Sequence, residues 1–205
     1  MDIICSFAGL ILALPLLLVT TAVVRIYLGS PVLFTQNRLG KDGVVFKLYK
    51  FRTMRDAFDA DHKPLPDSER LTRVGVLLRG ASLDELPQLF NVLKGDMSLV
   101  GPRPLPELYR DRFSQEQWVR HQVRPGLTCL AQVMGRNALT WEDKFAWDAK
   151  YVRTASLGLD FRIILRTVCC LIRREGITHG NHATMPEFMG AGGIPVTHAK
   201  GANEI

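Results

Sequence analysis

A long apolar segment interrupted by one proline constrains the fold of this chain more than any other feature. Residues 3–24 carry no charged side chain, Arg25 follows them, and Pro15 stands near their middle. A straight helix of about 22 residues would be roughly 33 Å long, which is enough to span a bilayer. A proline removes a helical hydrogen bond and kinks the helix, so each arm would reach about one leaflet. The pattern leaves two alternatives, a single spanning helix or a re-entrant helix that returns to its starting side.

The charge balance indicates where the rest of the chain lies. Lys+Arg number 26 and Asp+Glu 20, a net charge of +6, which favours anionic partners such as lipid headgroups, nucleotides or nucleic acid. A basic region after an apolar segment is expected in the cytoplasm. The four cysteines show no metal-ligand spacing, and adjacent Cys169 and Cys170 would make an awkward disulfide. Reduced thiols in a cytosolic compartment are therefore expected.

The region after the apolar segment predicts one compact domain of class α+β. Residues 29–31 (GSP) form a break, and short apolar runs on both sides of residues 40–43 (GKDG) predict a β-hairpin. Thr140, followed by two acids, predicts the start of a helix over residues 141–153. A second helix, from Asp160, combines apolar side chains with arginines, as helices that lie on an anionic membrane surface do.

The domain boundaries follow from these breaks. We expect a membrane helix over residues 1–28 and a cytoplasmic domain with a few short strands and interfacial amphipathic helices over residues 29–187. Glycines and small residues after Pro186 predict a flexible tail over residues 188–205.

Two adjacent carboxylates, Asp84 and Glu85, are the candidate catalytic residues. They stand in the first turn of a short amphipathic helix that ends at Gly95, with Ser82 as its N-cap in a capping box. Pro87 leaves open an N-cap one or two residues later, which would keep both acids in the first turn. Acids at this position also stabilise a helix N-terminus without any catalytic role. Neighbours in sequence diverge by about 100° around a helix, so the two carboxylates are suited to separate roles.

Basic residues near this pair indicate a phosphate site. Arg79 lies upstream, and Arg103 lies downstream between two prolines that restrict its backbone. A helix N-terminus flanked by fixed arginines can hold phosphate, and a carboxylate there can bind a divalent metal or attack phosphorus. Further candidates for phosphate or headgroup contact are Lys50, Arg52, Arg124 and Arg136.

Taken together, these motifs resemble the bacterial sugar transferases known as monotopic phosphoglycosyl transferases, in particular the small single-domain type that includes the diacetylbacillosamine-1-phosphate transferase of protein N-glycosylation. The resemblance runs from Asp2 to about Glu187. It rests on the proline-split apolar segment and on residues 34–40 (FTQNRLG), 50–54 (KFRTM), 82–95, 101–104 (GPRP) and 124–126 (RPG).

The resemblance implies an enzyme that transfers sugar-1-phosphate from a UDP-sugar to polyprenyl (undecaprenyl) phosphate and releases UMP. It implies a nucleophile at Asp84, through a covalent aspartyl-phosphosugar, with Glu85 as its partner and Mg²⁺ bound by the pair. It also implies phosphate binding by Arg79, Arg103 and Lys50 or Arg52. The apolar segment would be a re-entrant helix broken at Pro15, on the cytoplasmic face of the bacterial inner membrane.

The resemblance leaves the sugar and the assembly open. An N-acetylated amino sugar is expected, with a hexose such as galactose or glucose as the alternative. Cys129 stands where glycine is usual and Met134 where asparagine is usual, near the expected sugar end. The sequence does not determine the oligomeric state, and a homodimer is one of the alternatives. Outside this family, a non-enzymatic membrane-tethered binding protein would keep the anchor without needing Asp84. Nucleic-acid binding is not expected, because it would rest on net charge alone.

Overall fold

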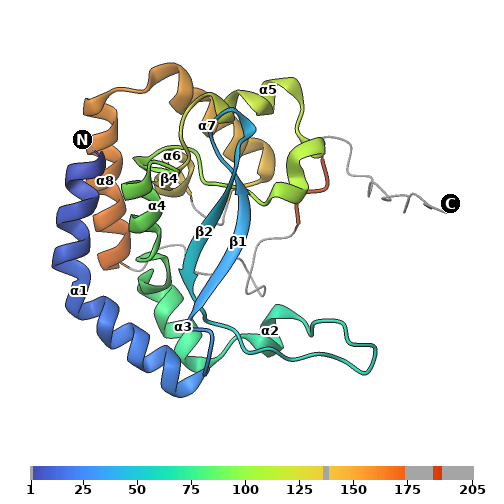
Figure 1. Cartoon of the computed structure of the whole chain (residues 1–205). Helices are drawn as coiled ribbons and strands as arrows, with labels where there is room; N and C mark the ends of the chain where they lie inside the picture. Colours follow the sequence, from blue (N-terminus) through green and yellow to red (C-terminus); the bar gives the residue numbers. More distant parts are fainter. Residues whose placement is uncertain (1, 136–138, 174–186, 191–205) are drawn as a thin grey trace, which may run out of the picture.

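The computed structural model describes residues 2–135, 139–173 and 187–190, and it confirms the predicted α+β class. Helix α1 (Asp2–Tyr27) runs along one side of a domain of short helices and small sheets (Figure 1). The ribbon of α1 bends along its length, and Pro15 lies inside it. A proline inside a helix cannot donate one of the backbone hydrogen bonds, and its ring clashes with the carbonyl group one turn earlier. A bend at this position is therefore expected.

The predicted hairpin is confirmed. Strand β1 (Leu33–Leu39) pairs antiparallel with β2 (Val45–Phe51), and a 3-10 turn, η1 (Lys41–Gly43), lies between them. Strand β2 is the inner strand, because Leu48 and Phe51 are buried in the domain core. Lys50 precedes Phe51 at the end of β2, and its side chain reaches Glu85.

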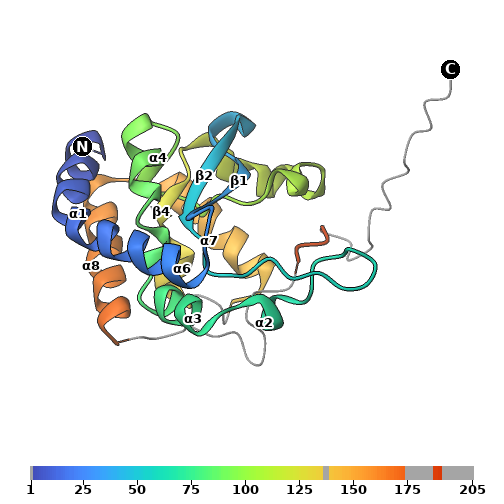
Figure 2. The same cartoon turned by 60° about the horizontal axis from the view of Figure 1, so that its bottom comes forward.

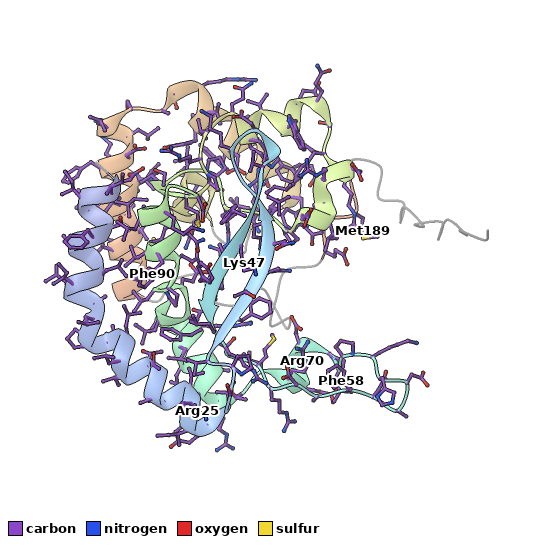
Figure 3. The ribbon with its side chains drawn as sticks, in the orientation of Figure 1. Arg25, Lys47, Phe58, Arg70, Phe90 and Met189 are labelled. Atoms are coloured by element: carbon purple, nitrogen blue, oxygen red, sulfur yellow. The ribbon has the colours of Figure 1, made fainter. Side chains whose placement is uncertain are left out.

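The chain between β2 and the next helices leaves the domain and returns. It projects outward with Phe58 exposed (Figure 3) and then forms α2 (Asp67–Arg70) and α3 (Arg73–Gly80). Helix α3 packs tightly against the end of the hairpin, because a Cβ at Gly75 would lie only 2.0 Å from the carbonyl oxygen of Thr53. This close approach requires glycine and brings Arg79, at the end of α3, close to Thr53.

The start of the central helix differs from the prediction. Ser82 has a left-handed backbone (φ 55°) and makes no capping bond, and residues Leu83–Glu85 form a separate 3-10 turn, η2. Helix α4 (Gln88–Lys94) begins only after Pro87 and ends at Gly95, as predicted. The capping-box prediction is therefore wrong. Pro87 lacks a backbone donor, so a tight turn precedes it in place of the first turn of an α-helix.

A parallel pair of short strands links the two halves of the domain. Strand β3 (Ser98–Val100) pairs with β4 (Gly126–Thr128), in the register Ser98↔Gly126. A Cβ at Gly101 would lie 2.3 Å from the Arg124 oxygen, so only glycine allows this approach. The loop of residues 101–104 is thereby packed against residues 124–126.

The second half of the domain is helical. Thr140 caps helix α7 (Trp141–Thr154), as predicted, and the cap takes the form of a capping box with Asp143. The remaining elements are the 3-10 helices η3 (Glu107–Arg112) and η4 (Val119–Gln122) and the helices α5 (Gln115–Trp118), α6 (Leu130–Met134) and α8 (Leu157–Arg173).

Helix α1 packs against the domain with its less apolar face inward. Its buried residues are Ser6, Thr20 and Val24, whereas large apolar side chains such as Leu12 (82 % exposed) and Leu18 point away from the domain. In water this arrangement would leave a large apolar surface exposed, which soluble proteins avoid. The helix is long and apolar enough to cross a membrane, by length and composition alone.

Both ends of α1 contact the same domain. At its start, Asp2 accepts a hydrogen bond from the Ser98 hydroxyl at 2.7 Å. At its end, Val24 lies in a buried cluster with Phe51 and Leu78. The two ends of the helix are therefore attached to one compact body.

The expected start of the tail differs from the structure. Phe188 is buried among Tyr109, Phe145 and other aromatic residues, and Arg112 Nη1 donates to its carbonyl oxygen at 2.6 Å. Met189 lies on the side of the domain away from α1 (Figure 3). Residues 188–190 thus belong to the folded domain, because burial of one aromatic ring anchors the segment. Residues 191–205 lie outside the described residues.

Candidate active site

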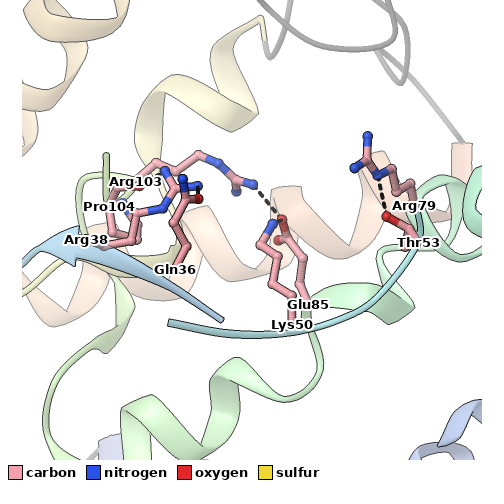
Figure 4. A network of polar contacts seen from close by, with 8 residues as sticks. All are labelled: Gln36, Arg38, Lys50, Thr53, Arg79, Glu85, Arg103 and Pro104. Carbon is pink, nitrogen blue, oxygen red and sulfur yellow. Dashed lines mark hydrogen bonds and ion pairs between the residues drawn. The ribbon is translucent and has the colours of Figure 1, made fainter. Parts of the chain in front are cut away.

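The predicted carboxylate pair lies where three cationic side chains converge. Glu85, on η2, accepts hydrogen bonds at one oxygen, Oε1, from Lys50 Nζ at 2.7 Å and Arg103 Nη2 at 2.5 Å (Figure 4). Lys50 comes from β2 and Arg103 from the loop after β3, so the turn is held between two elements. Glu85 is 15 % exposed, whereas Arg103 is 43 % exposed. The site is therefore enclosed on the carboxylate side and open along the guanidinium.

Asp84 lies beside Glu85 and is buried. Burial has the largest influence on the pKa of Asp84 and raises it, and the charge of Glu85 raises it further. Lys50, Arg79 and Arg103 act in the opposite direction without outweighing burial. Asp84 is thus a carboxylate of increased basicity surrounded by cations.

Glu85 shows the opposite shift. Burial by itself would raise the pKa of Glu85, but the charges and hydrogen bonds of Arg103 and Lys50 outweigh it and hold the pKa below its usual range. Glu85 in turn raises the pKa of Arg103, while burial lowers the pKa of Lys50. Two neighbouring carboxyl groups with pKa values moved apart are typical of groups with different catalytic roles.

The other predicted phosphate ligands differ in where they lie. Arg79 is near the pair, since its charge acts on Asp84, and its Nε donates to the Thr53 hydroxyl at 3.0 Å. Arg52 instead pairs with Asp56 at 2.6 Å and donates to the backbone oxygens of Ser30 and Met54. Of the two candidates in residues 50–54, Lys50 is the one that the structure brings to Glu85.

Arg124, of the RPG motif at residues 124–126, is not part of this network. Arg124 is exposed, and among the described residues it has no ion pair with Glu85. Its contribution to the site is through the backbone, which packs against Gly101. Arg136 lies outside the described residues.

Two buried charged residues, Arg120 and Asp148, and the half-buried Arg38 lie near Arg103, and none of them was a predicted site residue. Arg38 Nη1 donates to the Pro104 oxygen at 3.0 Å (Figure 4), Arg120 Nη2 donates to the Arg103 oxygen at 2.6 Å, and Arg120 pairs with Asp148. Arg38 stands inside a recognised motif, residues 34–40, which offered the only indication. Arg120 and Asp148 are 28 residues apart, so only the fold brings them together.

Asp84 is the carboxylate that would fit a magnesium ion arriving with a phosphate ligand. Within the described ranges, no group of three or more His, Cys, Asp or Glu side chains could hold a metal. Mg²⁺ is usually bound by only one or two carboxylates together with substrate phosphates, so a single carboxylate can suffice. Glu85 is already paired with two cations, which leaves Asp84 as the better-placed protein ligand.

The family model and the relatives that match this chain all belong to the bacterial sugar transferases. A model of the bacterial sugar transferase family matches residues 1–174. The chain is 51 % identical to an uncharacterized sugar transferase, EpsL, of Bacillus subtilis over 179 residues, which cover 87 % of this chain and 89 % of the relative. It is 43 % identical to a UDP-glucose:undecaprenyl-phosphate glucose-1-phosphate transferase of Caulobacter vibrioides, covering 85 % and 69 % of the two chains.

A third relative carries a different sugar in its name. The chain is 40 % identical to a UDP-N-acetylgalactosamine-undecaprenyl-phosphate N-acetylgalactosaminephosphotransferase of Aeromonas hydrophila, covering 86 % of this chain and 44 % of the relative. The family match extends over α1 and over the hairpin, η2 and the loop of residues 101–104, which carry the site residues. The chain therefore belongs to the bacterial sugar transferase family.

Proposed function

We propose that this protein is a phosphoglycosyl transferase that moves a sugar-1-phosphate from a UDP-sugar to undecaprenyl phosphate and releases UMP. The observation that carries the proposal is the pair at η2, where Glu85 is fixed between Lys50 and Arg103 beside the buried Asp84. The relatives from Caulobacter vibrioides and Aeromonas hydrophila are named for this reaction with two different sugars. A phosphoglycosyl transferase needs both a nucleophile and cations around phosphorus, and this site offers a buried carboxylate and nearby cations for these two roles.

Asp84 is the nucleophile in this proposal. A carboxylate oxygen of Asp84 attacks the phosphorus that bears the sugar, the bridging bond of the diphosphate breaks, and UMP leaves with the bridging oxygen. The lipid phosphate then attacks the same phosphorus and restores the free carboxylate. Burial and the charge of Glu85, which raise the pKa of Asp84, favour nucleophilic attack by increasing its basicity. Two steps allow the donor and the lipid, both anionic, to use one site in turn.

Glu85 organises the cations in this proposal. Because its pKa is held low, it stays ionised and keeps Lys50 and Arg103 directed toward the site. Arg103, which is partly exposed, and Arg79 would hold phosphoryl oxygens as charge develops on them. Mg²⁺, held by Asp84 and the donor diphosphate, would supply charge neutralisation for the leaving UMP.

The helices support attachment to the membrane from one side. Exposed apolar residues cover the outer face of α1, and Leu157, Phe161, Leu165 and Val168 form an exposed stripe at helical spacing on α8. Helices α1 and α8 lie side by side in both views of the fold (Figures 1 and 2). A helix whose two ends contact one compact domain cannot have those ends on opposite sides of a bilayer while the contacts persist. We infer a re-entrant α1 on the cytoplasmic face of the inner membrane.

The sugar is the finer part of the proposal. An N-acetylated amino sugar is our first expectation, and one relative is named for N-acetylgalactosamine. A relative named for glucose supports a hexose to a similar degree, at 43 % identity. A panel of UDP-sugars is therefore the appropriate substrate set.

A UMP-release assay tests the proposed function. The full chain in detergent or nanodiscs is given undecaprenyl phosphate, Mg²⁺ and each UDP-sugar in turn, and sustained UMP release that requires the lipid is expected for at least one sugar. Asp84→Asn should lower this rate by at least about 10³-fold, because an amide is a poor nucleophile. Asp61→Asn, at an exposed loop position, is the matched control and should retain activity. Full activity in Asp84→Asn would exclude the proposed mechanism and favour another nucleophile or a binding role.

A further inference from the structure

The backbone around Arg103 is held by two other arginines. Arg120 Nη2 donates to the carbonyl oxygen of Arg103 at 2.6 Å, and Arg38 Nη1 donates to that of Pro104 at 3.0 Å. The prolines on either side of Arg103 restrict its φ and ψ, so these two bonds fix the remaining freedom of the loop. The side chain of Arg103 leaves this fixed backbone and reaches Glu85.

Arg120 is itself held rigidly. Its Nε and Nη2 donate to Oδ2 of Asp148 at 3.0 and 2.9 Å, and the two side chains are 4 % and 5 % exposed. The guanidinium also lies over the rings of Phe113 and Phe145, at 5.8 and 5.6 Å from their centroids. Arg120 therefore has one orientation, which is set by α7 and by the aromatic core.

A buried ion pair is weak evidence of stability. Removing two charges from water costs several kcal/mol, and well-packed apolar residues often serve stability equally well. A buried ion pair is better explained when it also has a role other than stability. Here that role is to hold the backbone of Arg103, because the same Nη2 atom of Arg120 that donates to Asp148 also donates to the Arg103 carbonyl oxygen.

We propose that Arg120, oriented by Asp148 and assisted by Arg38, is a positioning residue that aims Arg103 at Glu85 and at the donor phosphate. The proposal rests on the proposed function and adds residues that touch neither Asp84 nor Glu85 in the described structure. It predicts that a change at Arg120 acts on the reaction only through Arg103. If Arg120 served only the stability of the fold, the effect of changing it would not depend on the residue at position 103.

A double-mutant cycle separates the two roles. UMP release is measured for the wild type, Arg120→Lys, Arg103→Lys and the double variant, all as full chains with unfolding midpoints recorded. Lysine keeps the charge opposite Asp148 but cannot bond both the carboxylate and the Arg103 carbonyl in the same fork. When Arg103 is present, we expect Arg120→Lys to lower kcat/KM for the UDP-sugar about tenfold or more, because one charge-assisted hydrogen bond is lost. In the Arg103→Lys background the further loss should be within about twofold.

Two further variants keep the test decisive. Arg38→Lys acts on the neighbouring carbonyl, should show the same dependence on Arg103, and decides the question if Arg120→Lys does not fold. Arg112→Lys is the matched control, because Arg112 also bonds a carboxylate, of Glu187, and a backbone oxygen, of Phe188, away from Glu85. Its effect should be equal in both backgrounds. Equal losses from Arg120→Lys in both backgrounds would overturn the positioning role, whereas an inactive wild type would instead overturn the proposed function.

Discussion

Arg103 donates a hydrogen bond from Nη2 to Oε1 of Glu85 at 2.5 Å, and the two residues are 18 positions apart in the sequence. The same carboxylate oxygen accepts from Lys50, which is 35 positions away. Glu85 thus joins β2, η2 and the loop after β3 at one atom. The consequence is an ionised Glu85 that keeps two cations beside Asp84.

The first prediction concerns the half-reaction at Asp84. If the sugar phosphate moves first to Asp84, UMP can attack the acyl phosphate and regenerate the donor without lipid. Labelled UMP should therefore exchange into the UDP-sugar in the presence of Mg²⁺ and the absence of undecaprenyl phosphate, and Asp84→Asn should abolish this exchange. Exchange is measured by chromatography of the labelled nucleotide pool. Absence of exchange in an enzyme that turns over with lipid would indicate direct attack by the lipid phosphate.

The second prediction concerns pH. Asp84 must be ionised to attack, and its pKa is raised above the ordinary value of 3.8, so the acid limb of kcat/KM should lie above pH 3.8. The charge of Glu85 is one cause of the raised value. In Glu85→Gln this cause is removed while Lys50 and Arg103 remain, so the acid limb should move to lower pH as the rate falls. An acid limb that stays in place would show that a group other than Asp84 controls it.

The third prediction concerns topology. With both ends of α1 on the cytoplasmic side, an epitope tag before Met1 should resist protease added to intact cells and be digested once the cells are permeabilised. Pro15→Ala restores a helical donor and should shift part of the population toward a spanning helix. Immunoblotting of the tag measures both. Digestion of the wild-type tag in intact cells would support a spanning helix instead.

The fourth prediction concerns the C-terminal anchor. Phe188 is 2 % exposed among aromatic rings, so Phe188→Ala should lower the free energy of unfolding by about 3 kcal/mol or more. Met189→Ala, at a half-buried neighbouring position, is the control and should cost clearly less. Denaturant unfolding followed by tryptophan fluorescence compares the two, since Trp141 packs against Phe188. Equal and small effects would mean that the segment is not anchored in solution.

Several features were predictable because their causes are local. Pro15 bends its own helix, the turn at residues 40–43 permits the hairpin, Thr140 caps α7, and Gly95 ends α4. The candidate pair, Asp84 and Glu85, and the cations Arg79 and Arg103 were also recognisable, since they stand in short stretches of sequence with characteristic spacing. In these cases a few neighbouring residues suffice to fix the backbone or to indicate the chemistry.

The tertiary structure decided what depends on distant segments. It selected Lys50 rather than Arg52 as the partner of Glu85, placed Arg120 and Asp148 behind Arg103, and buried Phe188 where a tail was expected. The opposite pKa shifts of Asp84 and Glu85 likewise follow from burial and from charges on other elements. Adjacent carboxylates in a sequence have similar surroundings until the fold buries both and gives Glu85 direct hydrogen bonds from two cations, because desolvation and Coulomb interactions depend on spatial distance and not on chain order.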